Sequence, residues 1–407
     1  MGIEQSRWWA VMDDLLDRSH LWRPEDLGSV VDGAAARLGL AITVYLVDHE
    51  QRTLRALAVP GRPTPGPQPV DGSPAGRAFT QVESVAEDGR RWAPMVNGTD
   101  RLGVLEVRLP AGIHQDERLA RACETVAGLV GHLVTTTSPR GDHLHLVRRS
   151  TPMTSGAELL WKLLPPLTVS VADFAVAAVL EPCYDVGGDA FDYTVDARRP
   201  QFAVLDATGR GMRAGLAAAV VLSCIRAARR AGGDLLEQAR AADEELLRQF
   251  PDARFATAVL AELDLDTGLL RYVNAGHPPP LVQRAGKIVE TLTGGRRRPL
   301  GIEGPAAAYG EVTLSPGDRL LLYTDGVTEA RDSAGRQFGA ERLADTVEEH
   351  VTEGLPLPEA LRRLSHTVLE HQAGPPADDL TLLLVEWSAA AAERTVPPTI
   401  RADDQAG

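Results

Sequence analysis

The sequence predicts an α+β protein with more than one domain. The chain has 407 residues, and one domain takes about 150 residues, so two or three domains are expected. Predicted strands come in hairpins and predicted helices in blocks, whereas a doubly wound parallel sheet would alternate strand and helix strictly. We therefore expect an N-terminal α+β domain followed by a sandwich of strands and helices.

The composition indicates a globular protein with an acidic surface. Hydrophobic residues make up 44% and charged residues 24% of the chain, and the formal net charge is −14. The first two values are ordinary for a globular protein. A strongly acidic chain repels phosphate backbones and anionic lipids, so the charge argues against nucleic acid and membrane surfaces as partners.

Cysteine use and hydropathy predict a cytoplasmic protein. Cys123, Cys183 and Cys224 lie far apart in the chain, and this spacing forms neither a disulfide framework nor a zinc pattern. Such cysteine use fits a reducing compartment. No run of about 18 apolar residues occurs, so we expect no membrane-spanning segment.

The N-terminal third predicts a helix, a domain and a linker. Residues 1–19 form an expected helix, because apolar side chains recur at near-helical spacing. Residues 20–135 then predict a helix, a strand meander, a Pro- and Gly-rich loop, a short helix, a hairpin and a long closing helix. This order is the layout of an α+β sensor domain. Residues 136–154 are polar with Pro and Gly, so a linker is expected there.

Residues 155–388 predict the second large domain, and the tail 389–407 is expected to be disordered. Apolar runs of period two indicate strands, and long Ala- and Leu-rich segments indicate helices. The main expected elements are strands at 174–181, 201–205, 257–264, 270–274 and 380–387 and helices at 212–231 and 235–250.

Four acidic motifs stand where predicted strands end. Each places Asp beside Gly or at a strand boundary, and Gly lets the backbone turn sharply and approach a ligand. Several short carboxylates aimed from strand ends suit hard cations such as Mg²⁺ or Mn²⁺. A plain turn is the alternative for any one of them. The motifs are Gly187-Gly188-Asp189, Asp206-Ala207-Thr208-Gly209, Thr324-Asp325-Gly326 and Asp378-Asp379-Leu380.

Asp189 and Asp206 are the first pair that could share a cation. They are separated by a short stretch that includes the predicted strand 201–205. An antiparallel pairing of 174–181 with 201–205 would carry the chain back towards the first motif. We therefore expect the two carboxylates to approach each other, as a hypothesis that spacing alone does not establish.

The ordered set of motifs resembles a known family. Each motif is weak alone, but together they follow the order of the SpoIIE-type phosphatase domain, a bacterial branch of the metal-dependent PPM (type 2C) Ser/Thr protein phosphatases. The resemblance covers residues 155–388. It is carried by Leu163-Leu164-Pro165-Pro166, Tyr184-Asp185-Val186-Gly187-Gly188-Asp189, Asp206-Ala207-Thr208-Gly209-Arg210-Gly211, Asn274-Ala275-Gly276-His277-Pro278, Pro299-Leu300-Gly301, Tyr323-Thr324-Asp325-Gly326 and Asp378-Asp379-Leu380-Thr381.

The resemblance implies an α-β-β-α sandwich, in which two antiparallel sheets stack and helices flank them. It also implies two Mn²⁺ or Mg²⁺ ions between the sheets, with Asp206 bridging the ions. Asp189 and Asp206 are the implied catalytic carboxylates. The implied metal ligands are Asp189, Asp206, the Ala207 carbonyl, Asp325 and Asp378, with Asp379 as the alternative to Asp378.

The implied reaction is hydrolysis of a phosphoserine or phosphothreonine ester by in-line attack of a metal-activated water. Arg210 departs from the family, which usually has His at this position. A guanidinium stays protonated, so it cannot protonate the leaving oxygen, but it can bind a substrate phosphate through a forked contact. We include Arg210 among the catalytic candidates, with a solvated turn residue as the alternative. His277 is a second candidate, for which a structural turn is the favoured interpretation.

Residues 20–135 resemble a GAF domain in element order and in the stretches 70–79 and 103–107. This resemblance implies a small-molecule ligand or a homodimer. The combined prediction is a sensor-controlled protein serine/threonine phosphatase. Its implied substrate is a phosphorylated regulatory protein of the anti-sigma-factor-antagonist type. The alternative, which Arg210 keeps open, is a catalytically weak PPM-fold scaffold that binds a partner and senses a small ligand.

Overall fold

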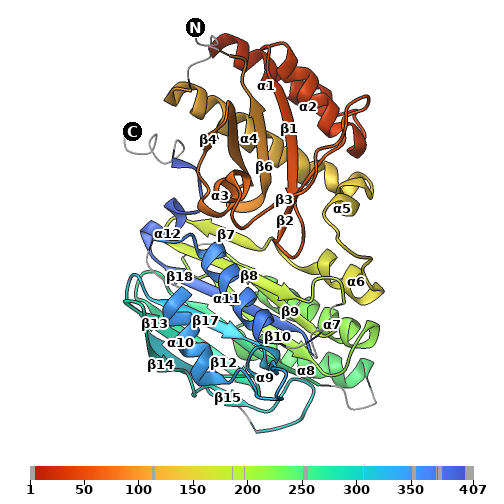
Figure 1. The fold of residues 1–407 in the computed structure, drawn as a ribbon. Coiled ribbons are helices and arrows are strands. Elements are labelled where there is room, and N and C mark those ends of the chain that lie inside the picture. Colours follow the sequence, from red (N-terminus) through yellow and green to blue (C-terminus); the bar gives the residue numbers. More distant parts are fainter. Residues whose placement is uncertain are drawn as a thin grey trace. The chain divides into compact units, whose positions relative to one another are not determined.

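The computed structural model describes residues 5–398 except 112–114, 186, 197, 251–254, 306, 351–353, 373 and 375–377. The chain divides into two compact units (Figure 1), and each is described by itself. The first unit is Met1–Thr151 with Glu393–Gly407, and the second unit is Pro152–Ala392. No helix within the described ranges is long and apolar enough to cross a membrane.

The first unit is built on one antiparallel sheet with helices on both faces. The strand order is β3-β2-β1-β6-β5-β4. Apolar side chains of α1, α2 and α4 pack on one face, and α3 packs on the other around Phe79. The strands are β1 (Ala41–Val47), β2 (Thr53–Ala56), β3 (Gln68–Pro69), β4 (Val85–Glu87), β5 (Arg90–Asn97) and β6 (Asp100–Arg108), and the helices are α1 (Gln5–Ser19), α2 (Leu27–Ala36), α3 (Pro74–Gln81) and α4 (Glu117–Thr137).

The segment 136–154, predicted as a linker, contains helical structure. The 3₁₀ helix η2 spans Ser138–Arg140 and α5 spans His143–Val147. Leu144 of α5 is fully buried in the core of the first unit, and the Arg148 Nε donates to the Val47 carbonyl at 2.9 Å. The polar composition of this segment gave no sign of the helix, because Leu144 is the one residue of α5 that is fully buried.

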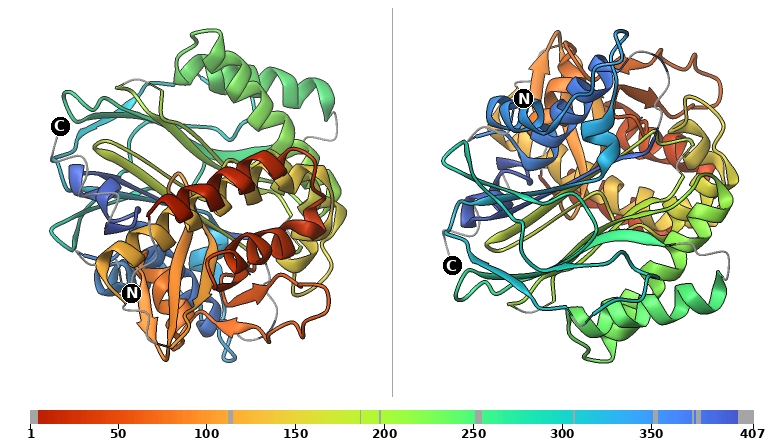
Figure 2. Two further views of the ribbon diagram at one scale, coloured as in Figure 1. Left: turned by 90° about the horizontal axis from the view of Figure 1, so that it is seen from above. Right: turned by 90° about the horizontal axis from the view of Figure 1, so that it is seen from below.

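The second unit stacks two sheets face to face with helices outside both, which confirms the predicted α-β-β-α class (Figure 2). One sheet has the order β15-β12-β11-β10-β9, with β16 paired to β12, and the other has the order β14-β13-β17-β18-β8-β7. Phe174, Phe191 and Phe202 lie in the apolar layer between the sheets. Helices α6, α7 and α8 cover the first sheet, and α10 and α11 cover the second.

The bounds of these elements follow the predicted segments closely in the helices and hairpins. The strands are β7 (Thr168–Val171), β8 (Phe174–Glu181), β9 (Asp189–Thr194), β10 (Gln201–Ala207), β11 (Ala256–Leu263), β12 (Leu269–Ala275), β13 (Leu281–Arg284), β14 (Lys287–Thr291), β15 (Arg296–Arg297), β16 (Gly310–Thr313), β17 (Arg319–Tyr323) and β18 (Leu380–Trp387). The helices are α6 (Ser155–Leu163), α7 (Met212–Arg230), α8 (Leu235–Gln249), α9 (Asp325–Glu329), α10 (Ala340–His350), α11 (Leu357–His371) and α12 (Ala389–Glu393).

The tail predicted as disordered begins with α12, and Ala391 of that helix is buried. Residues 399–407 lie outside the described residues.

One predicted strand pairing is wrong. Residues 174–181 do not pair with 201–205: β8 pairs with β18 and β7, whereas β10 pairs with β9 and β11 in the other sheet. Every residue of β8 is buried. A strand that is apolar on both faces carries no alternation by which its partner could be chosen.

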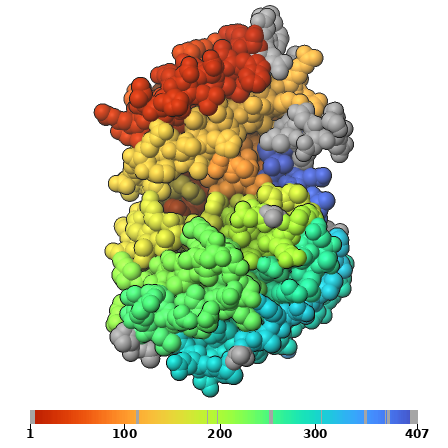
Figure 3. Space-filling view, turned by 180° about the vertical axis from the view of Figure 1, so that it is seen from behind, coloured from red at the N-terminus to blue at the C-terminus, as the bar shows by residue number. Residues whose placement is uncertain are grey.

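A buried carboxylate fastens α7 to the first sheet. Asp192 of β9 is 1% exposed, and it accepts hydrogen bonds from the Arg226 Nη2 at 2.7 Å and the Arg229 Nη1 at 2.9 Å. Removing one partner of a buried ion pair costs about 3–5 kcal/mol. These contacts therefore hold α7 against the sheet. The exposed side of α7 appears in green, with α8, in Figure 3.

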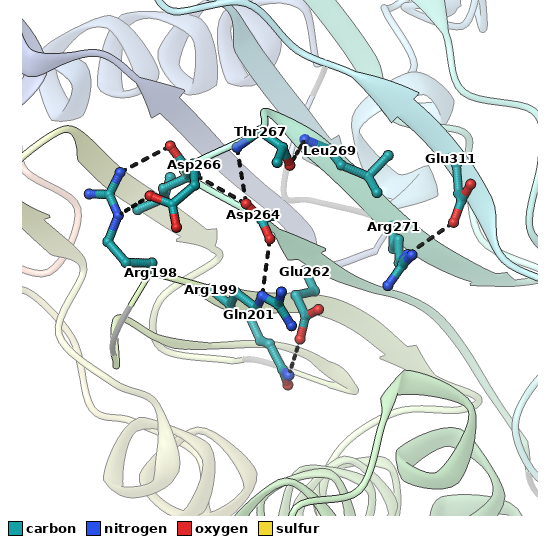
Figure 4. A network of polar contacts seen from close by, with 11 residues as sticks. Arg198, Arg199, Gln201, Glu262, Asp264, Asp266, Thr267, Leu269, Arg271 and Glu311 are labelled. Atoms are coloured by element: carbon teal, nitrogen blue, oxygen red, sulfur yellow. Dashed lines mark hydrogen bonds and ion pairs between the residues drawn. The ribbon is translucent and has the colours of Figure 1, made fainter.

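Ion pairs and hydrogen bonds stabilise the end of the same sheet at which β10 begins (Figure 4). The Arg198 Nε donates to Asp266 at 2.9 Å and the Arg199 Nε donates to Asp264 at 3.1 Å. These pairs tie the start of β10 to the β11–β12 hairpin. The far end of β10 is the end that carries Asp206.

Candidate metal and phosphate site

β9 and β10 bring the first two acidic motifs together at one end of their sheet. Asp206 is the register partner of Asp189, so the expected approach of these residues is confirmed, through β9 rather than β8. The Ala207 N–H donates to the Gly188 carbonyl at 3.1 Å. A Cβ on Gly188 would lie 2.1 Å from the Ala207 carbonyl oxygen. Only glycine permits this close approach of the two chains.

Asp189 lies where the two sheets meet. It is 2% exposed, and the Thr324 hydroxyl, just after β17, donates to its Oδ2 at 2.7 Å. The same hydroxyl oxygen accepts a hydrogen bond from the Thr381 N–H of β18 at 2.9 Å. The second sheet therefore orients a carboxylate of the first. Neither threonine is among the predicted site residues, although each lies within two residues of a predicted ligand.

The two aspartates of the last motif have different environments. Asp379 is 7% exposed, and its Oδ2 accepts three successive backbone N–H groups, those of Gly187, Gly188 and Asp189, at 2.6, 2.7 and 3.2 Å. The Asp378 side chain is 62% exposed. The Asp379 carboxylate therefore stabilises the loop before β9 that contains Gly187 and Gly188, which we call the glycine loop. Asp378 faces solvent.

Asp325 and Arg210 lie beside this last motif. Asp325 opens α9 directly after β17. A Cβ on the next residue, Gly326, would lie 1.9 Å from the Asp379 carbonyl oxygen, so this glycine lets the start of α9 pack against the motif. The Arg210 Nη2 is 3.8 Å from the Asp378 Oδ1, and its side chain is 65% exposed. The four acidic motifs thus lie in one neighbourhood.

The carboxylates of this neighbourhood repel one another. Burial, followed by the charges of Asp325, Asp378 and Asp379, raises the pKa of Asp206 to about 7. Burial, followed by the charge of Asp206, raises the pKa of Asp189 well above its usual range. Within the described residues, no Arg or Lys forms an ion pair with Asp189, Asp206 or Asp325.

This donor set fits hard divalent cations. Carboxylate oxygens are the ligands that Mg²⁺ and Mn²⁺ prefer, and a cation would offset a repulsion that the neighbouring side chains leave in place. In the described part of the chain, no three Asp, Glu, His or Cys side chains already converge closely enough to hold a metal ion. The ligand roles of Asp189, Asp206, the Ala207 carbonyl, Asp325 and Asp378 therefore stay predictions.

Substitutions of the adjacent aspartates should separate a ligand from a loop anchor. We expect Asp378→Asn to weaken Mn²⁺ binding by about tenfold or more, because a charged ligand is lost. Asp379→Asn should retain most of the affinity, because the amide oxygen can still accept the backbone N–H groups, whereas Asp379→Ala should not. Isothermal titration with Mn²⁺ measures this. Equal losses in the two Asn variants would make Asp379 a ligand as well.

A comparison with known protein families matches most of this unit. The family model described as Stage II sporulation protein E (SpoIIE) matches residues 196–388, a stretch that contains Asp206, Arg210, Asp325 and both aspartates of the last motif. The second unit is thus similar to the SpoIIE family over residues 196–388, and we refer to it as the SpoIIE-type domain. The matched stretch begins after Asp189. The likeness of the first unit to a GAF domain stays a prediction.

Two curated relatives and one solved structure are among the proteins similar to this chain. Protein IcfG of Synechocystis is 33% identical over 23% of this chain and 15% of its own length. Phosphoserine phosphatase RsbP of Bacillus subtilis is 27% identical over 50% of this chain and 49% of its own length. The SiaA-PP2C domain of Pseudomonas aeruginosa is 26% identical, with a TM-score of 0.49 over 57% of this chain and 94% of that domain. The chain thus spans half or less of these curated relatives.

His277 of the SpoIIE-type domain is part of a buried turn. It is 3% exposed. Its N–H donates to the Asn274 Oδ1 at 2.8 Å, and the Asn274 Nδ2 donates to the His277 carbonyl at 3.0 Å. Its Nδ1 is 2.8 Å from the Thr257 hydroxyl. These contacts support the structural interpretation that the sequence favoured.

Burial lowers the pKa of His277 to about 3, which predicts acid lability. The unfolded chain binds this proton below about pH 6.5 and the folded chain only near pH 3, so the free energy of unfolding should fall as pH falls through that range. Urea melts at several pH values should show a smaller loss in His277→Gln than in the wild type, whereas His350→Gln should behave as the wild type. An unchanged pH slope in His277→Gln would show that this histidine is not responsible.

Proposed function

We propose that the SpoIIE-type domain is a Mn²⁺- or Mg²⁺-dependent protein serine/threonine phosphatase. The main support is the group of carboxylates at the ends of β9, β10, β17 and β18. Burial, followed by the charges of its neighbours, raises the pKa of Asp206 in this group to about 7. The chemistry that two bound divalent ions supply is a water of lowered pKa and neutralisation of the phosphoryl oxygens. No protein nucleophile is required for such a reaction.

In this proposal the chain's own residues orient the site and bind the substrate. Asp206 and Asp189 present carboxylates from paired strands, and Thr324 fixes the orientation of Asp189 by its 2.7 Å hydrogen bond. Asp379 holds the glycine loop. Arg210 is exposed beside Asp378, and in this proposal it binds the substrate phosphate in a forked contact.

The substrate in this proposal is a phosphoserine or phosphothreonine on a regulatory protein of the anti-sigma-factor-antagonist type. Support comes from the family resemblance and from the likeness to a protein named as a phosphoserine phosphatase. Sensor control by the first unit, through a small ligand or a homodimer, and a cytoplasmic location belong to the same proposal.

Phosphate release from a phosphoserine peptide tests the reaction. We expect the full chain to turn over with Mn²⁺ or Mg²⁺, to stop in excess chelator, and to leave a phosphotyrosine peptide of the same sequence largely intact. Full activity in chelator would contradict the metal-dependent reaction. No turnover with either metal would favour the second candidate, a partner-binding scaffold, for which the exposed Arg210 in place of the usual His is the specific observation.

Arg210 should affect substrate binding more than turnover. We expect Arg210→Gln to raise the KM for the phosphopeptide by about tenfold, because one charge-assisted contact to phosphate is lost, with a smaller change in kcat. Arg240→Gln, an exposed arginine on α8, is the matched control. Steady-state kinetics on both variants measures this, and a loss confined to kcat would instead assign Arg210 to the chemical step.

A further inference from the structure

A small cavity of about 170 Å³ opens on the first unit, beside the start of β1 and the loop that follows β2. Its walls include the apolar residues Ile42, Leu57, Val59 and Pro63, and its two charged lining residues are Arg62 and Arg108. Sites for drug-sized ligands usually have about 300–1,000 Å³. The cavity therefore has the size for a molecule with few non-hydrogen atoms.

Each of the two lining arginines pairs with a buried carboxylate. The Arg62 Nη1 lies 2.7 Å from the buried Asp32 carboxylate, and the Arg62 side chain is 57% exposed. The Arg108 Nε donates at 3.0 Å to Glu106, which is fully buried and also lies 3.0 Å from the Arg90 Nη1. Both charged residues that line the cavity are cationic, in a chain whose net charge is −14.

Both lining arginines retain donors for a ligand. A guanidinium carries five N–H donors in a planar fork. Arg62 uses Nη1 in its ion pair, and Arg108 uses Nε and Nη2 in its contacts with Glu106. The partner carboxylates also hold the two guanidinium groups in place, so little side-chain freedom would be lost when a ligand binds.

We propose that this cavity binds a small organic carboxylate. Its carboxylate would contact Arg62 and Arg108, because guanidinium groups and carboxylates match in charge and in planar geometry. Its carbon chain would lie against Ile42, Leu57 and Val59, which gives an organic acid an advantage over inorganic phosphate. The prolines of the loop limit the conformations that binding must order.

Calorimetric titration of the full chain tests the ligand class. The probes are straight-chain mono- and dicarboxylates of two to six carbons, the primary amides of the same lengths, and inorganic phosphate. We expect at least one acid to bind. The amide of that acid, and inorganic phosphate, should each bind at least about tenfold more weakly. Failure of every acid to bind at about 10 mM, or equal binding of an acid and its amide, would overturn the proposal. Tighter binding of phosphate would overturn the preference for an organic acid.

Three variants locate the binding. Arg108→Gln should lower the affinity for the most tightly bound acid by about tenfold. Val59→Phe should abolish binding, because the larger side chain fills the cavity while all charges remain. Arg77→Gln, which removes an arginine of an exposed ion pair with Glu87 in the same unit, should leave affinity unchanged. Melting curves of each variant confirm folding. Unchanged affinity in Val59→Phe, or an equal loss in Arg77→Gln, would show that the acid binds elsewhere.

Discussion

Asp206→Asn should reduce Mn²⁺-dependent phosphate release by about a hundredfold to a thousandfold and, at the same time, stabilise the metal-free protein. The substitution keeps the shape of the side chain but removes the charge expected to bridge two cations. It also removes a carboxylate whose pKa burial and three neighbouring aspartates raise to about 7. A raised folded-state pKa means that ionising Asp206 at pH 8 costs stability, so its loss should add up to a few kcal/mol to the free energy of unfolding.

The opposite signs of the two effects distinguish a functional carboxylate from a structural one. Asp264→Asn, at the other end of the same sheet, is the control, because hydrogen bonds from Thr267 and Asp266, followed by the charge of Arg199, lower the pKa of Asp264. That variant should keep activity and gain no stability. Kinetics with a phosphoserine peptide and urea melts in chelator measure both quantities. An Asp206→Asn protein that is both active and less stable would contradict the assignment.

Gly188→Ala should abolish activity and destabilise the second unit by about 1–3 kcal/mol. The added Cβ would meet the Ala207 carbonyl oxygen at 2.1 Å and its carbon at 3.0 Å, so β9 and β10 would have to separate where Asp189 pairs with Asp206. A shift of about 1 Å between reacting groups can cost a hundredfold in rate.

Gly215→Ala is the matched control for this glycine. It lies in α7 near the same loop, and the atoms nearest its added Cβ are 3.7 Å away. Alanine is favoured over glycine inside a helix by about 1 kcal/mol, so this variant should be active and slightly more stable. Comparing phosphate release and urea melts of the two variants tests the argument. Normal activity in Gly188→Ala would show that the close strand approach is not needed.

The fold class and the acidic motifs could be predicted from the sequence because they depend on local signals. Helix α7 and the β11–β12 hairpin follow from composition, spacing and turn residues. The partner of β8 could not be predicted, because a strand buried on both faces fits any neighbour equally. The short helix α5 could not be predicted either, since Leu144 is its only fully buried residue and one residue gives no periodic pattern.

The roles of individual residues within the site could be assigned only from the three-dimensional structure. Asp378 and Asp379 are chemically identical in the sequence, and only the fold shows that one binds three backbone N–H groups while the other faces solvent. Thr324 likewise acquires its contact with Asp189 from the meeting of two sheets. Sequence spacing cannot report such contacts, because the partners are more than a hundred residues apart.

An anomalous-difference map of a Mn²⁺-soaked crystal tests the central claim most directly. The claim is that aspartates from the ends of two stacked sheets hold two divalent ions. We expect two peaks about 3.5–4 Å apart, with Asp206 between them and Asp189, Asp325 and Asp378 around them. Peaks only at other positions, in crystals whose protein releases phosphate from a phosphoserine peptide, would contradict the proposed site.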